Sequence, residues 1–463
     1  MQTASANIGG PAFDTSLVGA VPTSTHTPRP SVSGDELDTV PSWRATGTMA
    51  VITGTLTFNT LLASMTALGL PVNAGMVILC EMILLSAALG LGLNARLALP
   101  VIVAVFVSYM FFLMMLRPGI DLKAVRDILV PIAFYFVGRN LRDIAIMDRF
   151  VIGVGAFIVC FGFFEWAAVD LYVQYVGPLE YYIARGTVEA GDVSDYVRET
   201  GLFASGTRYG DRNLFPGLVG DHRVSSVFLE PVSMGNFGAI LFMWGAFRSG
   251  MKNRWMVFAL AALCIIGSDA RFGLMASVAV GAALLIARFT PRIALFVLPF
   301  AILAGLFAYG QTSIAILWDD NFSGRILWAA QIIDSLSWKH VLGISYIELF
   351  VADSGYAYVL TQIGIVGMVF VWALFVYTKG PNLDAWRFRF AFGVYLCLNL
   401  LVSNSAFSIK TGAILWAMLG VADCAQRVRS SYRRRDSKPR SMGSPVAFDD
   451  GLVVEPALAS QRI

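Results

Sequence analysis

The sequence predicts an all-α polytopic membrane protein, with about twelve transmembrane helices and two long periplasmic loops. Hydrophobic residues make up 57% of its 463 residues and charged residues only 14%, whereas an ordinary soluble domain is roughly 25% charged. A single soluble core stops growing at about 250–300 residues, so it could not hide this much apolar sequence from water. The composition therefore excludes a typical soluble enzyme and makes the bilayer the expected solvent.

Residues 1–45 are expected to form a disordered cytoplasmic tail, because they are rich in Ser, Thr, Pro and Gly and show no apolar period. A secretory signal would place its apolar segment close to the N-terminus, with a small-residue cleavage site after it. Here hydrophobicity begins near Thr48 and further apolar runs follow, so a signal peptide is not expected.

The transmembrane domain is predicted to cover residues 46–424, because predominantly apolar runs recur through it and about 20 such residues cross the hydrocarbon core. The predicted spans are residues 48–69, 72–92, 97–116, 121–138, 150–171, 226–247, 255–267, 272–287, 292–310, 354–377, 389–403 and 406–423. Two polar stretches, residues 172–225 and 311–353, are too long and too mixed to be simple turns. These two loops are the places where function is expected.

The distribution of basic residues predicts the orientation. With the N-terminus in the cytoplasm, most Arg and Lys residues between spans fall on the cytoplasmic side, as does the C-terminal tail of residues 425–463. Both termini are then cytoplasmic and both long loops face the periplasm. The C-terminal tail contains RVRSSYRRRDSKPR and is interpreted as a disordered anchor beside anionic lipid, with no nucleic acid as partner.

One segment disagrees with this orientation. RPGIDLKAVRD places Arg117, Lys123 and Arg126 on the predicted outer side. Either the fourth span is wrong, or something anionic holds these cations there.

The densest group of candidate functional residues is GDHRVSSVFLEPVSMGNFGAI, at the outer entrance to the sixth predicted span. A helix would align Arg223, Ser226 and Glu230 on one face. Pro231, however, disfavours helix at the residue before it and suits a first helical turn, so the span could begin there with residues 223–230 extended. In either geometry an Arg and a Glu lie close together near the outer surface, as a functional pair or as a structural one.

Three further sites carry ionisable residues at the predicted outer ends of spans, where such residues are costly. Asp269 and Arg271 lie in the short turn SDARFG, as an interfacial anchor or as ligand-binding groups. Arg325 lies on an amphipathic segment that is expected to rest on the outer membrane face, where its side chain binds a headgroup or only snorkels. Asp353 begins the tenth predicted span, either as a helix N-cap or as a catalytic carboxylate.

Several common chemistries can be excluded. The sequence has no P-loop, no G-x-G-x-x-G after a strand, no H-E-x-x-H, no D-x-D triplet and only three histidines, so neither a nucleotide cofactor nor a metal is expected. Guanidinium groups match phosphate oxygens bidentately, and a metal-free site would need them to neutralise a diphosphate. A lipid-linked diphosphate is therefore the expected ligand, with Glu230 or Asp353 as general base or as orienter of an acceptor hydroxyl.

Four motifs resemble the bacterial O-antigen ligase and polymerase superfamily, whose members act on undecaprenyl-diphosphate-linked sugars. The resemblance covers roughly residues 120–420 and rests on DLKAVRDILVPIAFYFVGR, RVSSVFLEPVSMGNFG, SGRILWAAQIIDSL followed by VLG, and DSGYAYVLTQIGIVG. It implies a helical membrane glycosyltransferase that acts at the periplasmic face of the bacterial inner membrane. The implied transfer is metal-independent and inverting.

The resemblance also implies roles for particular residues. The family's phosphate-binding arginines correspond best to Arg223 and Arg325, then to Arg126 and Arg271. Glu230 and Asp353 are the implied catalytic carboxylates. Two further residues of the motifs, Ser226 and Tyr356, complete the implied substrate-binding set.

The last motif favours one reaction within the family. Ser354, Gly364 and Gly367 follow the spacing of the ligases, but Asp353 stands where a ligase has His. This departure favours a polymerase that joins lipid-linked repeat units of an exopolysaccharide or O-antigen, with a flippase and chain-length or export proteins as partners. The alternatives are a ligase with another acceptor, a flippase for lipid-linked oligosaccharide, and a non-catalytic scaffold of a secretion complex.

Overall fold

The computed structural model describes residues 42–93, 98–117, 122–141, 143–203, 206, 214–215, 222–312, 322–345, 353–378, 380 and 382–436. Every regular element in these ranges is a helix, which confirms the predicted all-α class. Most of the predicted N-terminal tail and residues 437–463 lie outside the described residues.

Each predicted span overlaps a helix of the structure. These helices are α1 (Ser42–Ala67), α2 (Ala74–Gly92), α3 (Ala98–Leu116), α4 (Leu122–Leu141), α5 (Ile144–Ala167), α10 (Pro231–Phe247), α11 (Arg254–Gly267), α12 (Arg271–Ile286), α13 (Arg292–Thr312), α16 (Gly355–Tyr377), α17 (Leu383–Val402) and α18 (Ile409–Asp436). Within the described residues, seven are long and apolar enough to cross a bilayer, namely α1, α2, α3, α5, α13, α16 and α17. The chain is therefore a polytopic membrane protein, and the larger number of spans stays a prediction.

Some helix boundaries differ from the predicted ones for local reasons. α17 begins at Leu383 instead of residue 389, because Asn382 caps it by accepting a hydrogen bond from the Ala385 backbone N–H. The polar residues in its first turns hid this start from a search for apolar runs. α18 continues to Asp436, so residues 425–436 of the predicted tail are helical.

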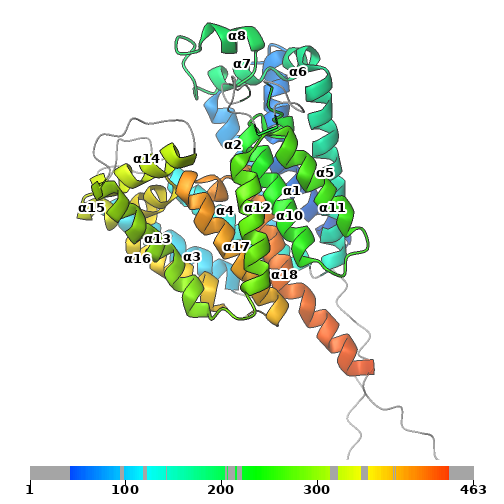
Figure 1. Cartoon of the computed structure of the whole chain (residues 1–463), viewed down its shortest axis with the longest axis vertical. Helices are drawn as coiled ribbons and strands as arrows, with labels where there is room; N and C mark the ends of the chain where they lie inside the picture. The colour runs from blue at the N-terminus through cyan, green and yellow to red at the C-terminus, as the bar shows by residue number, and fades with distance from the viewer. Residues whose placement is uncertain are drawn as a thin grey trace, which may run out of the picture. The chain divides into compact units, whose positions relative to one another are not determined.

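The two long loops contain helices of their own. The first holds most of α6 (Val169–Val176), then α7 (Pro178–Ala184) and α8 (Asp195–Thr200), and the second holds α14 (Phe322–Ser335) and α15 (Trp338–Val341). In Figure 1 α6, α7 and α8 gather at one end of the helix bundle. α7 packs on α1, where the Tyr181 hydroxyl donates to Asn59 Oδ1 at 2.6 Å.

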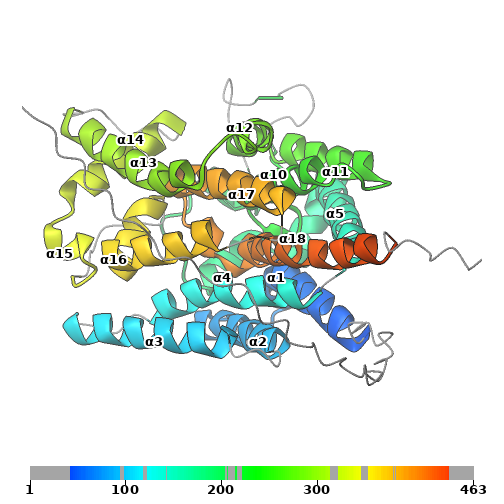
Figure 2. The same cartoon turned by 90° about the horizontal axis from the view of Figure 1, so that it is seen from below.

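α18 lies inside the bundle and packs against α4, α17, α10 and α1 (Figure 2). α4 and α18 approach closely because Gly138 of α4 meets the backbone of Ala417 and Gly420 of α18 meets the backbone of Tyr135, with no side chain between them. The outer helices instead expose large apolar side chains, such as Leu79 and Ile83 on α2 and Phe111 on α3. Faces of this kind are expected to meet lipid.

Some contacts between helix ends join segments that are predicted to lie on the same side of the membrane. At ends predicted to face outward, Thr60 of α1 donates to the Val227 carbonyl, and Asn236 of α10 donates to Ser405 at 3.2 Å. At the opposite end of α10, Arg248 pairs with Asp148 at 2.6 Å, and both belong to segments predicted to face inward.

α16 is broken at Gly364, which has φ 66° and ψ 169° inside an otherwise regular helix. Leu342 and Gly343, in the turn after α15, pack against the backbone of Gly364. Arg117 holds this turn against the break in α16. The Nε atom of Arg117 donates to the Gly343 carbonyl at 2.5 Å, and Nη2 donates to the carbonyls of Thr361 at 2.9 Å and Gln362 at 2.6 Å. One of the cations that disagreed with the predicted orientation is therefore held by backbone carbonyls of a broken helix.

Candidate functional site

The N-terminal end of α10 is the centre of the candidate site. Pro231 is its first residue, and Glu230 before it has extended backbone angles, φ −139° and ψ 121°. Upstream, only the short 3-10 turn η3 (Ser226–Phe228) is helical, and Ser226 and Leu229 have positive φ values of 53° and 61°. The predicted helix start at the proline is confirmed, whereas a common helical face upstream of it is wrong, because the left-handed residues interrupt any helix there.

Three donors fix the Glu230 carboxylate. The Tyr182 hydroxyl donates to Oε1 at 2.7 Å, the Ser233 hydroxyl donates to Oε2 at 2.9 Å, and the Lys410 ammonium lies 3.3 Å from Oε1. Tyr182 comes from α7 and Lys410 from the first turn of α18. The Glu230 side chain nevertheless stays 31% exposed, so the carboxylate is held in place and still open on one side.

These contacts set the protonation state of Glu230. Burial alone would raise the pKa of its carboxyl group, but the charge of Lys410 and the hydrogen bonds from Tyr182 and Ser233 outweigh burial and lower the pKa below its usual value. Burial also raises the pKa of Tyr182 well above 10, so the phenol stays protonated and donates. Glu230 is therefore ionised at neutral pH, which suits an orienting group better than a strong base.

Arg126, a predicted phosphate ligand, is already engaged by carboxylates of the protein. Its guanidinium pairs with Glu81 of α2 and donates to Asp127 Oδ1 from Nε at 2.8 Å and from Nη2 at 2.6 Å. The Tyr358 hydroxyl of α16 donates to the other oxygen of Asp127. Arg126 is predicted to face outward beside an anion, and the structure gives it two acids of the protein itself, Glu81 and Asp127. Arg126 therefore stabilises helix packing.

Arg223 is built into the fold rather than presented at the surface. It is 3% exposed, and its Nε donates to the Ser268 carbonyl at 3.0 Å. This contact ties the segment before η3 to the end of α11.

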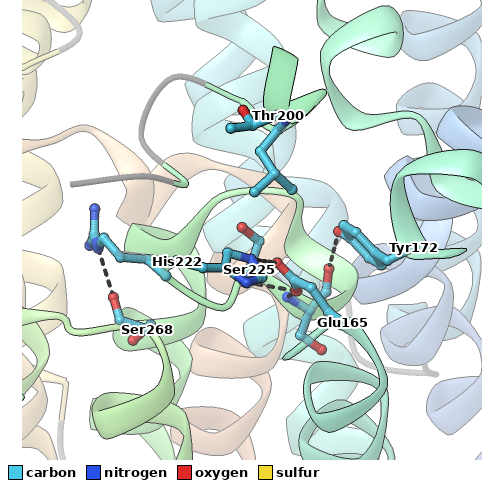
Figure 3. A network of polar contacts seen from close by, with 9 residues as sticks. Glu165, Tyr172, Thr200, His222, Ser225 and Ser268 are labelled. Carbon is cyan, nitrogen blue, oxygen red and sulfur yellow. Dashed lines mark hydrogen bonds and ion pairs between the residues drawn. The ribbon is translucent and has the colours of Figure 1, made fainter. Parts of the chain in front are cut away.

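Glu165 organises the same segment from the last turn of α5 (Figure 3). The Ser225 backbone N–H donates to both carboxylate oxygens, at 3.0 and 2.9 Å, and the Ser226 N–H donates at 2.5 Å. His222 Nε2 lies 3.1 Å from Oε1. The Ser226 hydroxyl, a predicted substrate ligand, is buried and donates to the Ile158 carbonyl at 2.6 Å, so it belongs to this structural network.

Replacing Glu165 with Gln is expected to lower the free energy of unfolding by about 1–3 kcal/mol. The amide NH₂ would replace a carboxylate oxygen that accepts hydrogen bonds from the backbone N–H groups of Ser225 and Ser226, so one of these donors would lose its acceptor. The measurement is detergent-solubilised thermal or SDS-induced unfolding. Glu180→Gln is the control, since this residue lies in the first turn of the short helix α7 and its side chain is exposed. Equal unfolding curves for Glu165→Gln and the native chain would contradict the role given to this carboxylate.

The structure brings two other predicted residues together. Arg325 Nη1 of α14 lies 4.0 Å from Asp353 Oδ1, and their side chains are 30% and 36% exposed. The N-cap of α16 is Ser354, whose hydroxyl accepts a hydrogen bond from the Ala357 N–H at 3.4 Å, so Asp353 does not have the capping role. Its carboxylate instead pairs with Arg325.

Tyr356, another predicted substrate ligand, is wholly buried. Its hydroxyl donates to the Cys397 carbonyl of α17 at 3.2 Å. Two residues further along α16, Tyr358 instead reaches the network of Arg126 and Asp127. Tyr356 therefore connects helices in the core.

Arg271 is the first residue of α12, and α12 packs against the first turns of α10, which follow Glu230. The helices approach this closely because Gly235 and Gly273 lack side chains where their backbones meet. Asp269, in the turn before α12, accepts hydrogen bonds from the backbone N–H groups of residues 214 and 215 at 2.8 and 3.3 Å. Asp269 thereby ties the first long loop to the start of α12.

The segment between α17 and α18 connects the Arg325–Asp353 pair with the start of α10. Gly355 at the beginning of α16 packs directly on the Ser403 carbonyl, which leaves no room for a side chain. Ser405 then receives hydrogen bonds from Asn236 of α10 at 3.2 Å and from Asn399 at 2.9 Å. Lys410 follows a few residues later, so one short stretch of chain links both carboxylates.

Sequence reasoning missed several charged residues that the structure places in or beside this site. They are Glu81, Asp127, Glu165, Arg185, His222 and Lys410. Glu81 and Glu165 carried a usable signal, since each is an isolated acid within an apolar run, where a charge is costly. Lys410 carried the same signal at the start of the last span.

Among the described residues, no group of three or more His, Cys, Asp or Glu side chains is arranged to hold a metal ion. Comparisons with protein-family models, with curated proteins and with solved structures found no match to this chain. The fold and the geometry at the start of α10 are therefore the observations on which its function can be argued.

Proposed function

We propose that this protein is a membrane glycosyltransferase that polymerises oligosaccharide repeat units linked to undecaprenyl diphosphate. The observation that carries the proposal is the partly exposed Arg325–Asp353 pair, joined through the α17–α18 segment to the Glu230–Lys410 pair. Partly exposed ion pairs at the ends of apolar helices suit a ligand that carries both a charged group and a lipid chain. A polyprenyl diphosphate has both.

The proposed chemistry assigns a role to each group. The donor is the growing glycan on its lipid diphosphate, and a terminal hydroxyl of a lipid-linked repeat unit attacks the anomeric carbon. Arg325, and Arg271 at the start of α12, stabilise the departing diphosphate. Asp353 takes the proton of the attacking hydroxyl. Glu230, whose carboxylate is held by Tyr182, Ser233 and Lys410, orients that hydroxyl.

The experiment that tests the proposal uses purified full-length protein and a defined lipid-linked repeat unit, without nucleotide or added metal. A ladder of products that differ by one repeat unit is the expected result. A single transfer to a different acceptor would favour the ligase alternative. Absence of any glycan transfer by a folded preparation would overturn the enzyme class.

One observation favours the flippase alternative. α16 is interrupted at Gly364, and transporters often build their binding sites from broken helices. The two functions leave different lipid pools in a deletion strain. Polymerase loss leaves single repeat units accessible at the outer face of the membrane, whereas flippase loss traps them inside.

A further inference from the structure

Lys410 is a buried cation beside the Glu230 carboxylate. Its side chain is 11% exposed, and its ammonium lies 3.3 Å from Glu230 Oε1 and 6.0 Å from the centroid of the Tyr182 ring. A lysine is seldom buried without a partner, because leaving water penalises its charge. The ammonium and the Tyr182 hydroxyl both act on the same carboxylate oxygen.

Other charged groups face this pair from neighbouring helices. Tyr181 and Tyr182 of α7 both interact electrostatically with Glu230, and Arg185 interacts with both tyrosines. From α2, Glu81 lies within electrostatic range of Arg185 and Lys410. Glu81 forms its ion pair with Arg126, whereas Glu230 forms its ion pair with Lys410.

The position of Lys410 is fixed by the backbone around it. α18 begins only one residue earlier, directly after the short turn η4 (Ser405–Phe407). Gly412 packs on the Ala406 carbonyl, 2.7 Å from where a side chain would begin, so this first turn of α18 has little freedom. The ammonium therefore meets Glu230 from a rigid element.

We propose that Lys410 is a positioning residue that keeps the Glu230 carboxylate ionised and in a fixed orientation for the acceptor hydroxyl. The inference rests on the proposed function, because it gives Lys410 a part in that reaction. Without the ammonium, Glu230 would be a partly buried carboxylate that favours its protonated form. A protonated Glu230 would be a weaker acceptor for a hydrogen bond from the attacking hydroxyl.

The activity test replaces Lys410 with Met, which has a similar length and no charge. An opposite charge at this distance lowers a carboxyl pKa by about 1–3 units, so Lys410→Met should move the acid limb of the pH–rate profile upward by about 1–3 pH units. Lys410→Arg should return the limb toward its native position. An acid limb that stays in place in Lys410→Met would overturn the proposal.

A second test measures the interaction of Lys410 with Glu230 through the pH dependence of stability, without an activity assay. In the native chain the Glu230 pKa is lowered, so its contribution to stability is complete above the unfolded pKa and is lost only as the pH falls through the folded value. In Lys410→Met burial raises the folded pKa above the unfolded one. Stability should then fall as the pH rises from the unfolded pKa of Glu toward that raised value.

The matched comparison is the double variant Lys410→Met/Glu230→Gln. The unfolding temperature of Lys410→Met should fall relative to the double variant between about pH 4.5 and 7, while the native chain and Glu230→Gln keep a constant difference. Parallel curves for the two Lys410 variants would overturn the coupling. Lys339→Met, at an exposed lysine of α15, should change neither the profile nor the curves.

The two tests distinguish the failure of this inference from the failure of the proposed function. If no pH yields polymer with the native chain, the polymerase proposal fails, while the unfolding curves still report whether Lys410 controls Glu230. If the native chain polymerises and the Lys410→Met profile is unchanged, only the positioning role fails.

Discussion

Replacing Arg325 with Ala is expected to slow glycan elongation by about 10²–10³-fold, the usual cost of losing one group that stabilises a developing negative charge. Arg325 pairs with Asp353 at 4.0 Å, and its side chain is 30% exposed, so a diphosphate can reach its guanidinium. The measurement is the rate at which the product ladder lengthens with purified protein. Arg325→Lys should have intermediate activity, because it keeps the charge and loses the bidentate fork.

Arg198→Ala is the control for this prediction. Arg198 lies on α8 in the first long loop and donates to the Ala190 carbonyl at 3.0 Å from an exposed position. Its loss should leave elongation unchanged. Full activity in Arg325→Ala would contradict the assignment, and an equal loss in Arg198→Ala would attribute the effect to the overall charge of the outer loops.

Two ion pairs at opposite ends of the bundle differ in exposure, and the difference supports this choice of site. At the end predicted to face inward, Arg389 and Asp423 are 3% and 5% exposed, and Tyr135 adds a hydrogen bond at 2.8 Å to the same carboxylate. Such a closed pair fixes helices and has no room for a ligand. At the opposite end, Arg325 and Asp353 are each about one-third exposed, so a ligand can compete for them at a smaller desolvation cost.

The fold class could be predicted because it follows from composition and from the length of apolar runs, which need no knowledge of tertiary contacts. The helices within the two polar loops could not be found this way. α7 is only seven residues long, and it is stabilised by packing on α1 and by the hydrogen bond from Tyr181 to Asn59. Neither contact leaves a periodic pattern in the sequence.

Site residues could be predicted only where their neighbours in the sequence already mark them as unusual. Glu230 and Asp353 are recognisable because they stand at the starts of apolar spans. The roles of Arg126 and Lys410 depend on partners 45 and 180 residues away, Glu81 and Glu230, which only the packed helices bring into contact. A cation counted as free in the sequence can therefore be neutralised in the fold, as Arg126 is.

Replacing Gly364 with Ala is expected to lower the free energy of unfolding by about 2–6 kcal/mol, the sum of a glycine-only backbone conformation and of overpacking. Gly364 has φ 66° and ψ 169°, and a methyl group there would lie 2.7 Å from the Leu342 carbonyl carbon. Relief of this clash would require the turn after α15 to leave the break in α16 and would separate Arg117 from the carbonyls that it binds. Unfolding in detergent measures the loss.

Gly305→Ala is the matched control, because a methyl group at Gly305 of α13 meets nothing within 4 Å and the residue has ordinary helical angles. Its stability should equal or slightly exceed that of the native chain, since Ala favours helix over Gly. The N-terminal half of α16 begins two residues after Asp353, so Gly364→Ala should also reduce elongation in the protein that remains folded. A Gly364→Ala variant that is as stable and as active as Gly305→Ala would mean that the break in α16 neither supports the fold nor positions Asp353.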